Sequence, residues 1–270
     1  MLWREYARRA RIGLDLQGHV PDVEVLPEGV RKAHQEGVAG MSARHDEMRR
    51  EGDLRGAHRP DVKIVDGRLE ADPVRAALDA CEGALCLGVT VLTGAPIHDA
   101  LAITRAVRAN YPDLPIVWGG WHPSLFPDEC LLEPAVSAVV AGQGEETFAE
   151  IVDRYREGRT LAGILGVTWQ DSTGQTIKAP PRPTRDVNAL PRHNYDLVPV
   201  EEYFRRKGKR QFDYISSIGC RFRCAFCADP FVYKRSWYGL DAERMASELH
   251  ALRQRYGFDE IAFQDETFFT

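Results

Sequence analysis

The chain carries at residues 220–227 the sequence Cys-Arg-Phe-Arg-Cys-Ala-Phe-Cys, which holds three of its six cysteines. Thiolates spaced Cys-x3-Cys-x2-Cys on one short loop can converge on a single inorganic centre. A structural zinc site needs a closed tetrahedron of four ligands, whereas an iron-sulfur cube held by Cys220, Cys224 and Cys227 keeps one iron open. The motif therefore favours a [4Fe-4S] cluster that supports chemistry. A partial zinc site or three unrelated thiols are the alternatives.

The residues around this loop predict the start of a parallel barrel. Residues 214–219 read as a short buried strand, so the loop opens at the carboxyl end of a strand, where barrel enzymes place their chemistry. A helix follows that begins after Asp241 and stops at Gly257. Residues 260–264 then read as a second strand, and the order strand, loop, helix, strand is a βαβ unit.

Strands and helices also alternate earlier in the chain. Strands are expected at residues 62–66, 84–92, 115–118 and 135–141, and helices at residues 74–80, 97–109 and 145–155. Asp72 and Pro73 are expected to be the N-cap and the first residue of the earliest of these helices. This alternation predicts a doubly wound parallel sheet, which binds ligands outside the carboxyl ends of its strands. Three glycine-containing loops follow these strands, at residues 90–94, 118–124 and 141–146. Glycine lets the backbone approach a flat or phosphate-bearing ligand closely, so we expect a ligand at this edge.

The remaining segments complete the expected domain organisation. We expect a poorly defined segment at 1–60, a Rossmann-like domain at 61–160, a hairpin and proline-rich linker at 161–210, and an incomplete barrel at 211–270. The basic run at residues 205–210 reads as a solvated loop. Three further thiols, Cys81, Cys86 and Cys130, read as structural residues.

Composition excludes several classes of function. The net charge of -5 gives no sign of nucleic-acid binding. No apolar run approaches the roughly 20 residues that span a bilayer, and the N-terminus lacks the apolar core of a signal peptide. Six cysteines, three of them clustered, fit a reducing compartment better than a disulfide framework, so a cytoplasmic location is expected.

The cluster motif, with Phe226 before its last cysteine, resembles the cluster loop of radical S-adenosylmethionine enzymes. Residues 116–129, with Gly-Gly-x-His-Pro-Ser, and the run Gly-x-Gly-Glu at residues 142–145 resemble the cobalamin-binding domain of the class B subfamily. The resemblance implies that cobalamin contacts Thr90, Thr93, Gly119, Gly120, His122, Gly142, Gly144 and Glu145. It also implies that Phe226 packs near adenine and that Asp265 and Glu266 bind the methionyl ammonium.

Two departures from the family pattern qualify these expectations. The Asp-x-His-x-x-Gly signature is absent, which implies a cobalamin without a protein histidine on cobalt. The first strand of the cobalamin domain is not evident, and the chain covers only two strands and one helix of a six-unit barrel, so it reads as truncated.

The resemblance implies an enzyme that cleaves S-adenosylmethionine reductively and uses the resulting radical, with cobalamin, to methylate or otherwise modify an unactivated carbon of a small molecule or natural product. A flavodoxin or ferredoxin would supply the electron. Two other readings remain: a radical enzyme that does not use cobalamin, and a non-catalytic fragment that binds cobalamin or a metal only.

Overall fold

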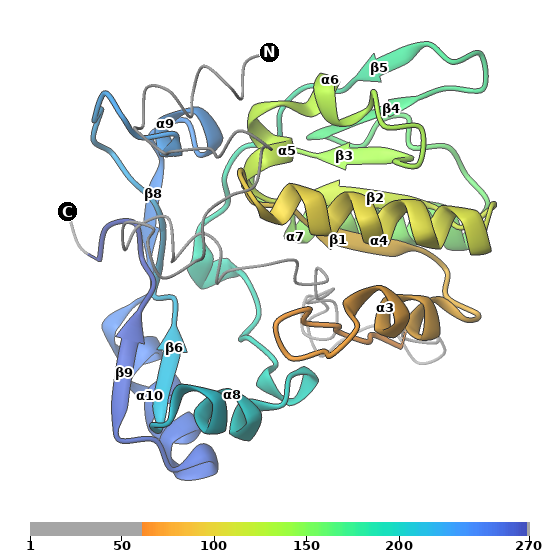
Figure 1. The fold of residues 1–270 in the computed structure, drawn as a ribbon. Helices are drawn as coiled ribbons and strands as arrows, with labels where there is room; N and C mark the ends of the chain where they lie inside the picture. The colour runs from red at the N-terminus through yellow and green to blue at the C-terminus, as the bar shows by residue number, and fades with distance from the viewer. Residues whose placement is uncertain (1–60, 269–270) are drawn as a thin grey trace, which may run out of the picture.

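The computed structural model describes residues 61–268 and contains a five-stranded sheet followed by two strand pairs (Figure 1). The strands of the large sheet, in spatial order, are β1 (Leu87–Thr90), β2 (Ile116–Gly119), β3 (Ala138–Val140), β4 (Val167–Gln170) and β5 (Thr176–Lys178). Strands β1, β2 and β3 run parallel, while β4 and β5 are antiparallel. The carboxyl ends of the three parallel strands therefore meet at one edge, as the alternation of elements predicted.

Helices cover both faces of this sheet because its strands are apolar on both sides. The helices are α3 (Pro73–Cys81), α4 (Pro96–Asn110), α5 (Trp121–Leu125), α6 (Pro127–Cys130) and α7 (Glu145–Arg156). On one face, Trp118 of β2 packs in the same apolar cluster as Val107 of α4. On the other face, Val117 packs with Ile151 of α7. Figure 1 shows α4 and α7 on opposite sides of β2.

Local signals explain where several of these elements begin and end. The carboxylate of Asp72 accepts a hydrogen bond from the backbone N–H of Arg75, and Pro73 is the first residue of α3, as predicted.

The buried indole of Trp118 donates to Thr104 Oγ1 over 2.9 Å, so the polar edge of this large ring has a partner.

The C-terminal part is built on a second parallel strand pair. Its elements are the 3-10 turns η2 (Val187–Ala189) and η3 (Tyr195–Leu197), helices α8 (Val200–Lys207), α9 (Asp229–Val232) and α10 (Ala242–Tyr256), and strands β6 (Gln211–Tyr214), β7 (Ser217–Gly219), β8 (Trp237–Gly239) and β9 (Glu260–Phe263). Strand β6 pairs with β9 in parallel, and α10 connects them. Phe212 and Tyr214 of β6 pack against Leu249 and Leu252 of α10, as the predicted βαβ unit requires.

Hydrogen bonds tie the two parts together. The hydroxyl of Tyr203 in α8 donates to the carboxylate of Asp66, close to the start of the described chain. In the linker, the side chain of Asn188 donates to the carbonyl of Gly239 over 3.0 Å and accepts from the backbone N–H of Asp241 over 2.8 Å. The linker is therefore attached to the C-terminal part by specific bonds. The domain boundaries proposed from the sequence stay a prediction.

Three expectations about local structure were wrong. Residues 62–66 do not form a strand; only Asp66 makes an isolated bridge, and its carboxylate is held by Arg68. The expected strand at residues 214–219 is divided into β6 and β7, and β7 pairs antiparallel with β8, which was not predicted.

Within residues 61–268 no helix is long and apolar enough to cross a membrane.

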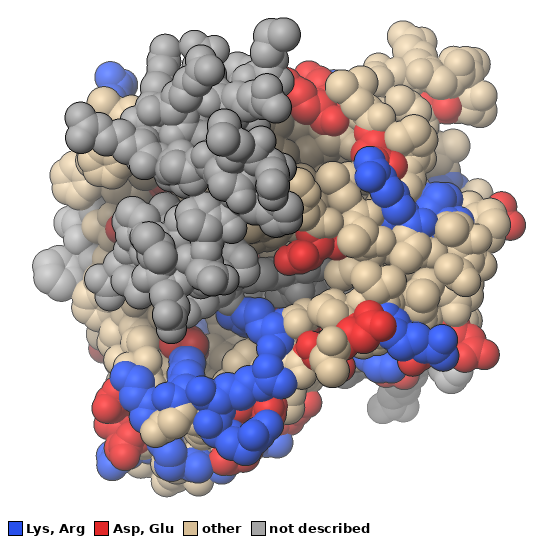
Figure 2. All heavy atoms as spheres, in the orientation of Figure 1, with Lys and Arg blue, Asp and Glu red and all other residues tan. Residues whose placement is uncertain are grey.

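The third error concerns the basic run at residues 205–210. Its first three residues end α8, and Gly208 takes the left-handed conformation that stops the helix. Figure 2 shows the Lys and Arg side chains over this part of the molecule lying among acidic ones. The ion pairs are Arg205 and Arg206 with Glu202, Lys207 with Asp213, Lys209 with Glu260, and Arg210 with Glu201.

Candidate functional site

The carboxyl edge of the parallel sheet brings the first two predicted loops into contact. Thr90 and Gly119 are paired residues at the ends of β1 and β2. The next residue, Gly120, has a φ of +95°, and a Cβ there would lie 3.0 Å from Thr90 Cγ2 and 3.2 Å from the backbone nitrogen of Val91. Glycine is needed at position 120 because both the backbone conformation and the close approach exclude a side chain.

His122 joins the same two loops through its ring. Its Nδ1 lies 3.3 Å from the hydroxyl of Thr93, and its backbone N–H donates to the carbonyl of Val91 over 3.0 Å. Burial lowers the pKa of His122, and the negative charge of Glu129 opposes this only in part. The imidazole is therefore neutral near pH 7, and it can both donate and accept a hydrogen bond.

Ser124 connects the second loop to the third. Its hydroxyl donates to the carbonyl of Gly120 over 2.6 Å and accepts from the backbone N–H of Gly142 over 2.9 Å. The sequence placed Ser124 in this loop without giving it a role. Gly144 precedes α7, and Glu145 is its first residue, so the predicted contacts in the third loop sit at the start of that helix.

The cluster loop lies between β7 and α9. Cys224 is exposed, while Cys220 and Cys227 are half-buried, and all three thiols are free. The hydroxyl of Thr267 donates to Cys220 Sγ over 3.0 Å, and the backbone N–H of Cys227 donates to the carbonyl of Cys224. Among residues 61–268, no three Cys, His, Asp or Glu side chains gather as metal ligands. The loop thus carries the three donors without converging them, and Phe226 is 93% exposed beside them.

Two of the predicted acidic residues have different surroundings. Asp265 Oδ1 accepts from the backbone N–H of Ser216 over 2.9 Å and from the hydroxyl of Ser217 over 2.6 Å, so this carboxylate holds the corner between β6 and β7. Glu266 is exposed as a residue, but its carboxyl group lies among neighbouring groups that partly desolvate it. Desolvation of its carboxyl group, together with the nearby negative charges of Asp229 and Asp265, raises the pKa of Glu266.

Asp229 was not predicted. Its side chain is fully buried at the start of α9, and neither carboxylate oxygen has a hydrogen-bond partner among the described residues. The same is true of Asp265 Oδ2. Burial raises the pKa of Asp229. No sequence pattern marks this residue, because an aspartate before a proline is usually a turn signal.

The two halves of the site face one cavity of 230 Å³. Glu145 from the sheet edge and Glu266 from the end of β9 both line it, as do Trp121 and Tyr233. The rings of Trp121 and Tyr233 meet edge to face with their centroids 5.9 Å apart. The structure thus brings one predicted cobalamin residue and one predicted S-adenosylmethionine residue to a common space. The three cluster cysteines do not line it.

The residues fit the implied groups by their chemistry. Three free thiols in one loop are the donor set of an iron-sulfur cluster with an open iron. Both carboxylate oxygens of Asp229, and Oδ2 of Asp265, lack partners among the described residues, and such groups call for a donor or a cation. At the sheet edge, Gly142 has a φ of +78° and a Cβ there would meet only the carbonyl of Val232, at 3.8 Å, so the backbone is open to a flat ligand.

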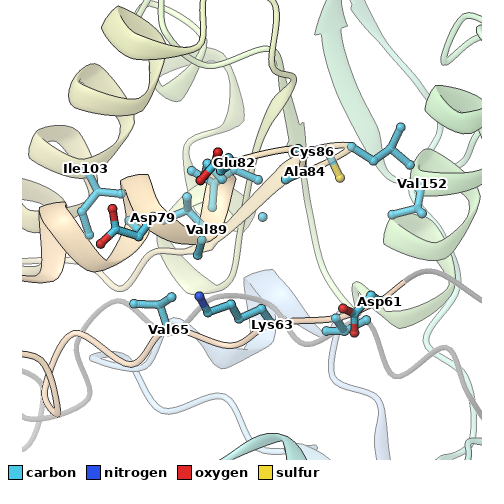
Figure 3. Close-up of a pocket in the computed structure, with 18 of the residues that line it drawn as sticks. Asp61, Lys63, Val65, Asp79, Glu82, Ala84, Cys86, Val89, Ile103 and Val152 are labelled. Carbon is cyan, nitrogen blue, oxygen red and sulfur yellow. The ribbon is translucent and has the colours of Figure 1, made fainter.

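A larger cavity of 390 Å³ lies away from this edge, beside β1. Figure 3 shows Asp61, Lys63 and Val65 on one side of it and Val89 and Ile103 on the other. It includes none of the residues predicted to bind a cofactor, but Cys81 and Cys86 line it.

Burial acts on the three thiols outside the cluster loop. It raises the pKa of Cys86 to about 11 and that of Cys130 to about 12, and it also raises that of Cys81. These thiols therefore stay protonated at neutral pH, which suits the structural role expected for them.

Comparison with known proteins identifies a domain family in the first part of the chain. Residues 40–152 match the model of the B12 binding domain. The chain is 34% identical over 213 residues to an uncharacterised methyltransferase of Pyrococcus horikoshii. This alignment covers 77% of this chain and 46% of the relative. It is 24% identical over 199 residues to the cytidylyl-2-hydroxyethylphosphonate methyltransferase of Streptomyces wedmorensis. That alignment covers 63% of this chain and 37% of the relative. The chain thus spans less than half the length of either protein.

Solved structures share the fold. The radical S-adenosylmethionine methyltransferase TsrM from Kitasatospora setae, with cobalamin and a [4Fe-4S] cluster bound, superposes with a TM-score of 0.60 at 20% identity. That match covers 73% of this chain and 40% of TsrM. The cobalamin-dependent radical enzyme OxsB, with aqua-cobalamin and S-adenosylmethionine bound, gives a TM-score of 0.61 at 20% identity, over 74% of this chain and 28% of OxsB.

Proposed function

This chain has a B12-binding domain and the fold of cobalamin-dependent radical S-adenosylmethionine enzymes, and we propose that the protein is a methyltransferase of that kind acting on a small molecule. In this proposal Cys220, Cys224 and Cys227 would hold a [4Fe-4S] cluster, which would supply the electron for reductive cleavage of S-adenosylmethionine, and bound cobalamin would supply the group that modifies an unactivated carbon of the substrate. A one-electron carrier such as a flavodoxin or ferredoxin supplies the electron, in the cytoplasm.

One observation carries the proposal. The carboxyl edge of the parallel sheet and the end of β9 face the same 230 Å³ cavity, with Glu145 on one wall and Glu266 on the other. A methyl group has to pass from one cofactor to a carbon activated by the other, so both cofactors must address a common space. The contact between Trp121 and Tyr233 fixes the distance between the two walls.

The chain's own residues then have separate tasks. Gly119, Gly120, Gly142 and Gly144 supply open backbone for the corrinoid, and the neutral His122 with Thr90, Thr93 and Glu145 supplies hydrogen-bonding groups at its rim. Cys220, Cys224 and Cys227 hold the cluster after the loop draws its thiols together. Glu266 binds the methionyl ammonium, while Asp265 positions the corner on which it stands. Phe226, exposed beside the thiols, packs on adenine.

Anaerobic reconstitution of the chain with iron and sulfide tests the cluster. We expect about four irons per chain and, after reduction, an electron paramagnetic resonance signal that shifts when S-adenosylmethionine is added. Single alanine variants of Cys220, Cys224 and Cys227 should lose this signal. Cys130→Ala is the matched control, because its buried thiol lies outside the loop, and it should retain iron. Iron that binds equally well to a Cys224→Ala variant would contradict the proposal.

Hydroxocobalamin titration tests the other half. We expect a corrinoid absorbance that co-purifies with the chain and a spectrum without a nitrogen ligand from His122. If the cluster signal shifts with S-adenosylmethionine but the chain binds no corrinoid, the protein is a radical enzyme that works without cobalamin. A chain that binds corrinoid or zinc but no cluster would be a non-catalytic binding module.

A further inference from the structure

We propose that the outer face of the cluster loop is the docking surface for an acidic one-electron carrier protein. The surface consists of four cations, Arg221, Arg223, Lys234 and Arg235, which we name the loop cations, and of two exposed aromatic rings, Phe222 and Phe231. The inference rests on the proposed function, since it requires a cluster in this loop. It adds where the electron enters and which chemistry recognises its carrier.

The loop cations differ from the other dense group of basic side chains. All four are exposed, and none forms an ion pair with another residue of the part of the chain that the structure describes. In the run from Arg205 to Arg210, by contrast, each Lys and Arg is paired with an acid. Of these two groups, the loop cations are the one whose charge is available for a partner.

The loop's own sequence carries almost no negative charge. Between Cys220 and Gly239 the only acidic residue is Asp229, and it is fully buried. The whole chain nevertheless has a net charge of -5. A local positive face on an acidic protein steers an acidic partner to one place. The opposite charges there raise the rate of encounter, and the like charges elsewhere on the surface repel the partner.

The backbone holds the cations together. Lys234 and Arg235 both have left-handed conformations, with φ of 54° and 64°. Non-glycine residues rarely adopt this conformation. The ammonium of Lys234 donates to the carbonyl of Phe231 over 2.7 Å, and Arg235 Nε donates to the carbonyl of Arg221 over 3.3 Å. The second bond ties the end of the loop to its first turn.

Aromatic rings complete the surface. Phe222 is 59% exposed and Phe231 is 66% exposed, whereas large apolar side chains are normally covered. Protein interfaces typically combine aromatic anchors and Arg with a polar rim. Arg221 stands over the ring of Trp237, with 5.7 Å between the guanidinium carbon and the ring centroid, and this stacking orders its side chain before a partner arrives.

The position of the surface identifies the kind of partner. Cys224 is exposed and follows Arg223 directly in the chain, so a protein docked on the loop cations lies beside one of the three proposed cluster ligands. The step needs no atom transfer. One electron leaves the reduced flavin or iron-sulfur centre of the carrier, which is oxidised by one electron, and the cluster is reduced by one electron.

The test uses a bacterial flavodoxin as the carrier and the reconstituted full chain as the acceptor. The variant is Arg221→Gln/Arg223→Gln/Lys234→Gln, which removes three charges and leaves the bond of Arg235. The matched control, Lys178→Gln/Lys209→Gln/Arg253→Gln, removes three exposed charges elsewhere. Stopped-flow absorbance under anaerobic conditions gives the rate of cluster reduction, and reduced methyl viologen, a small cation, serves as a reductant that needs no docking.

We expect the loop variant to be reduced by flavodoxin at least tenfold more slowly than the wild type at low ionic strength, with the control variant unchanged. The wild-type rate should fall steeply as salt rises, and the rate of the loop variant should not. Methyl viologen should reduce all three proteins equally. This last result shows that the cluster is intact, so a slower reduction by flavodoxin alone is caused by weaker docking.

Four results would overturn the inference. Equal rates of cluster reduction by flavodoxin for the loop and control variants would show that the loop cations are not the docking surface. Reduction of the wild type by viologen but not by flavodoxin or by a ferredoxin would leave the proposed function standing and reject this partner. Salt-sensitive binding of a short single-stranded DNA, without flavodoxin binding, would assign the cations to a polyanion. A wild type that viologen cannot reduce would reject the proposed function itself, and this inference with it.

Discussion

The indole ring of Trp121 meets the phenol ring of Tyr233 edge to face, at an interplanar angle of 84° and a centroid distance of 5.9 Å. Trp121 belongs to α5 at the edge of the large sheet, and Tyr233 follows α9 behind the cluster loop. The pair therefore joins the two predicted cofactor regions directly.

Replacing either ring should weaken this junction. We expect Trp121→Ala and Tyr233→Ala each to lower the free energy of unfolding by roughly 1–3 kcal/mol, because each loses apolar contact area as well as the ring pair. The double variant should cost less than the sum, with a coupling of about 0.5–1.5 kcal/mol measured by urea denaturation. Leu132→Ala, at a side chain that is 80% exposed, is the control. Strictly additive losses would show that the rings do not interact.

Two glycines with positive φ allow strain and steric clash to be separated. A Cβ on Gly120 would lie 3.0 Å from Thr90 Cγ2, whereas one on Gly94, with a φ of +111°, would meet nothing within 4 Å. Gly94→Ala should therefore cost only the conformational strain, about 1–2 kcal/mol. Gly120→Ala should cost roughly 2–4 kcal/mol, because the neighbouring strand must also move. Thermal or urea unfolding gives both values, and similar losses would argue against the close approach.

His122 makes the stability depend on pH. Burial lowers its pKa in the folded protein below the ordinary value of about 6.5, so the unfolded chain binds more protons as the pH falls. The stabilising contribution is complete above pH 6.5 and is lost as the pH falls through the folded pKa. Imidazole resonances followed by NMR should titrate below 6.5. His122→Gln should flatten the difference in unfolding free energy between pH 8 and pH 5, and an unchanged difference would exclude this residue as its source.

A buried ionic network supports α10. The hydroxyl of Tyr214 donates to Glu248 Oε2 over 2.9 Å, and Arg244 Nε donates to Oε1 over 2.7 Å. Glu248→Ala should cost about 3–5 kcal/mol, because it leaves the guanidinium and a buried hydroxyl without their acceptor.

The conservative variant provides the check. Glu248→Gln keeps one acceptor oxygen for Tyr214 but removes the charge and places an NH2 donor where an oxygen accepted from Arg244, so we expect a smaller loss of roughly 1–3 kcal/mol in the same urea titration. An equal loss for both variants would mean that packing, rather than the polar contacts, sets the cost.

The sequence predicted best what is decided locally or by burial on both faces. Asp72 and Pro73 marked the start of α3, and Gly257 marked the end of α10, because caps and left-handed glycines act within a few residues. Strand β8 could not be predicted, since three residues carry little pattern and its partner β7 lies across the cluster loop. The strand expected at residues 62–66 failed because alternation alone does not provide a neighbouring strand.

The candidate site shows the same division. The loops holding Gly120, His122 and the cluster cysteines follow from motifs in the chain. The roles of Ser124 and Asp229 depend on contacts with other loops, so no nearby residue reveals them. The cluster ligands and the cofactor contacts remain predictions that the experiments above address.

The pairing of Gly219 with Trp237 has one further consequence. The chain leaves β7 for the cluster loop and returns through β8 to the place where it left. Residues 220–236 are therefore an insert with its two ends side by side, and they can change shape without lengthening or shortening the path from β6 to α10. Apart from Cys220, Cys224 and Cys227, residues within the insert can change while the surrounding scaffold is kept, provided that position 219 stays glycine, where a Cβ would lie 2.2 Å from the carbonyl oxygen of Ser236.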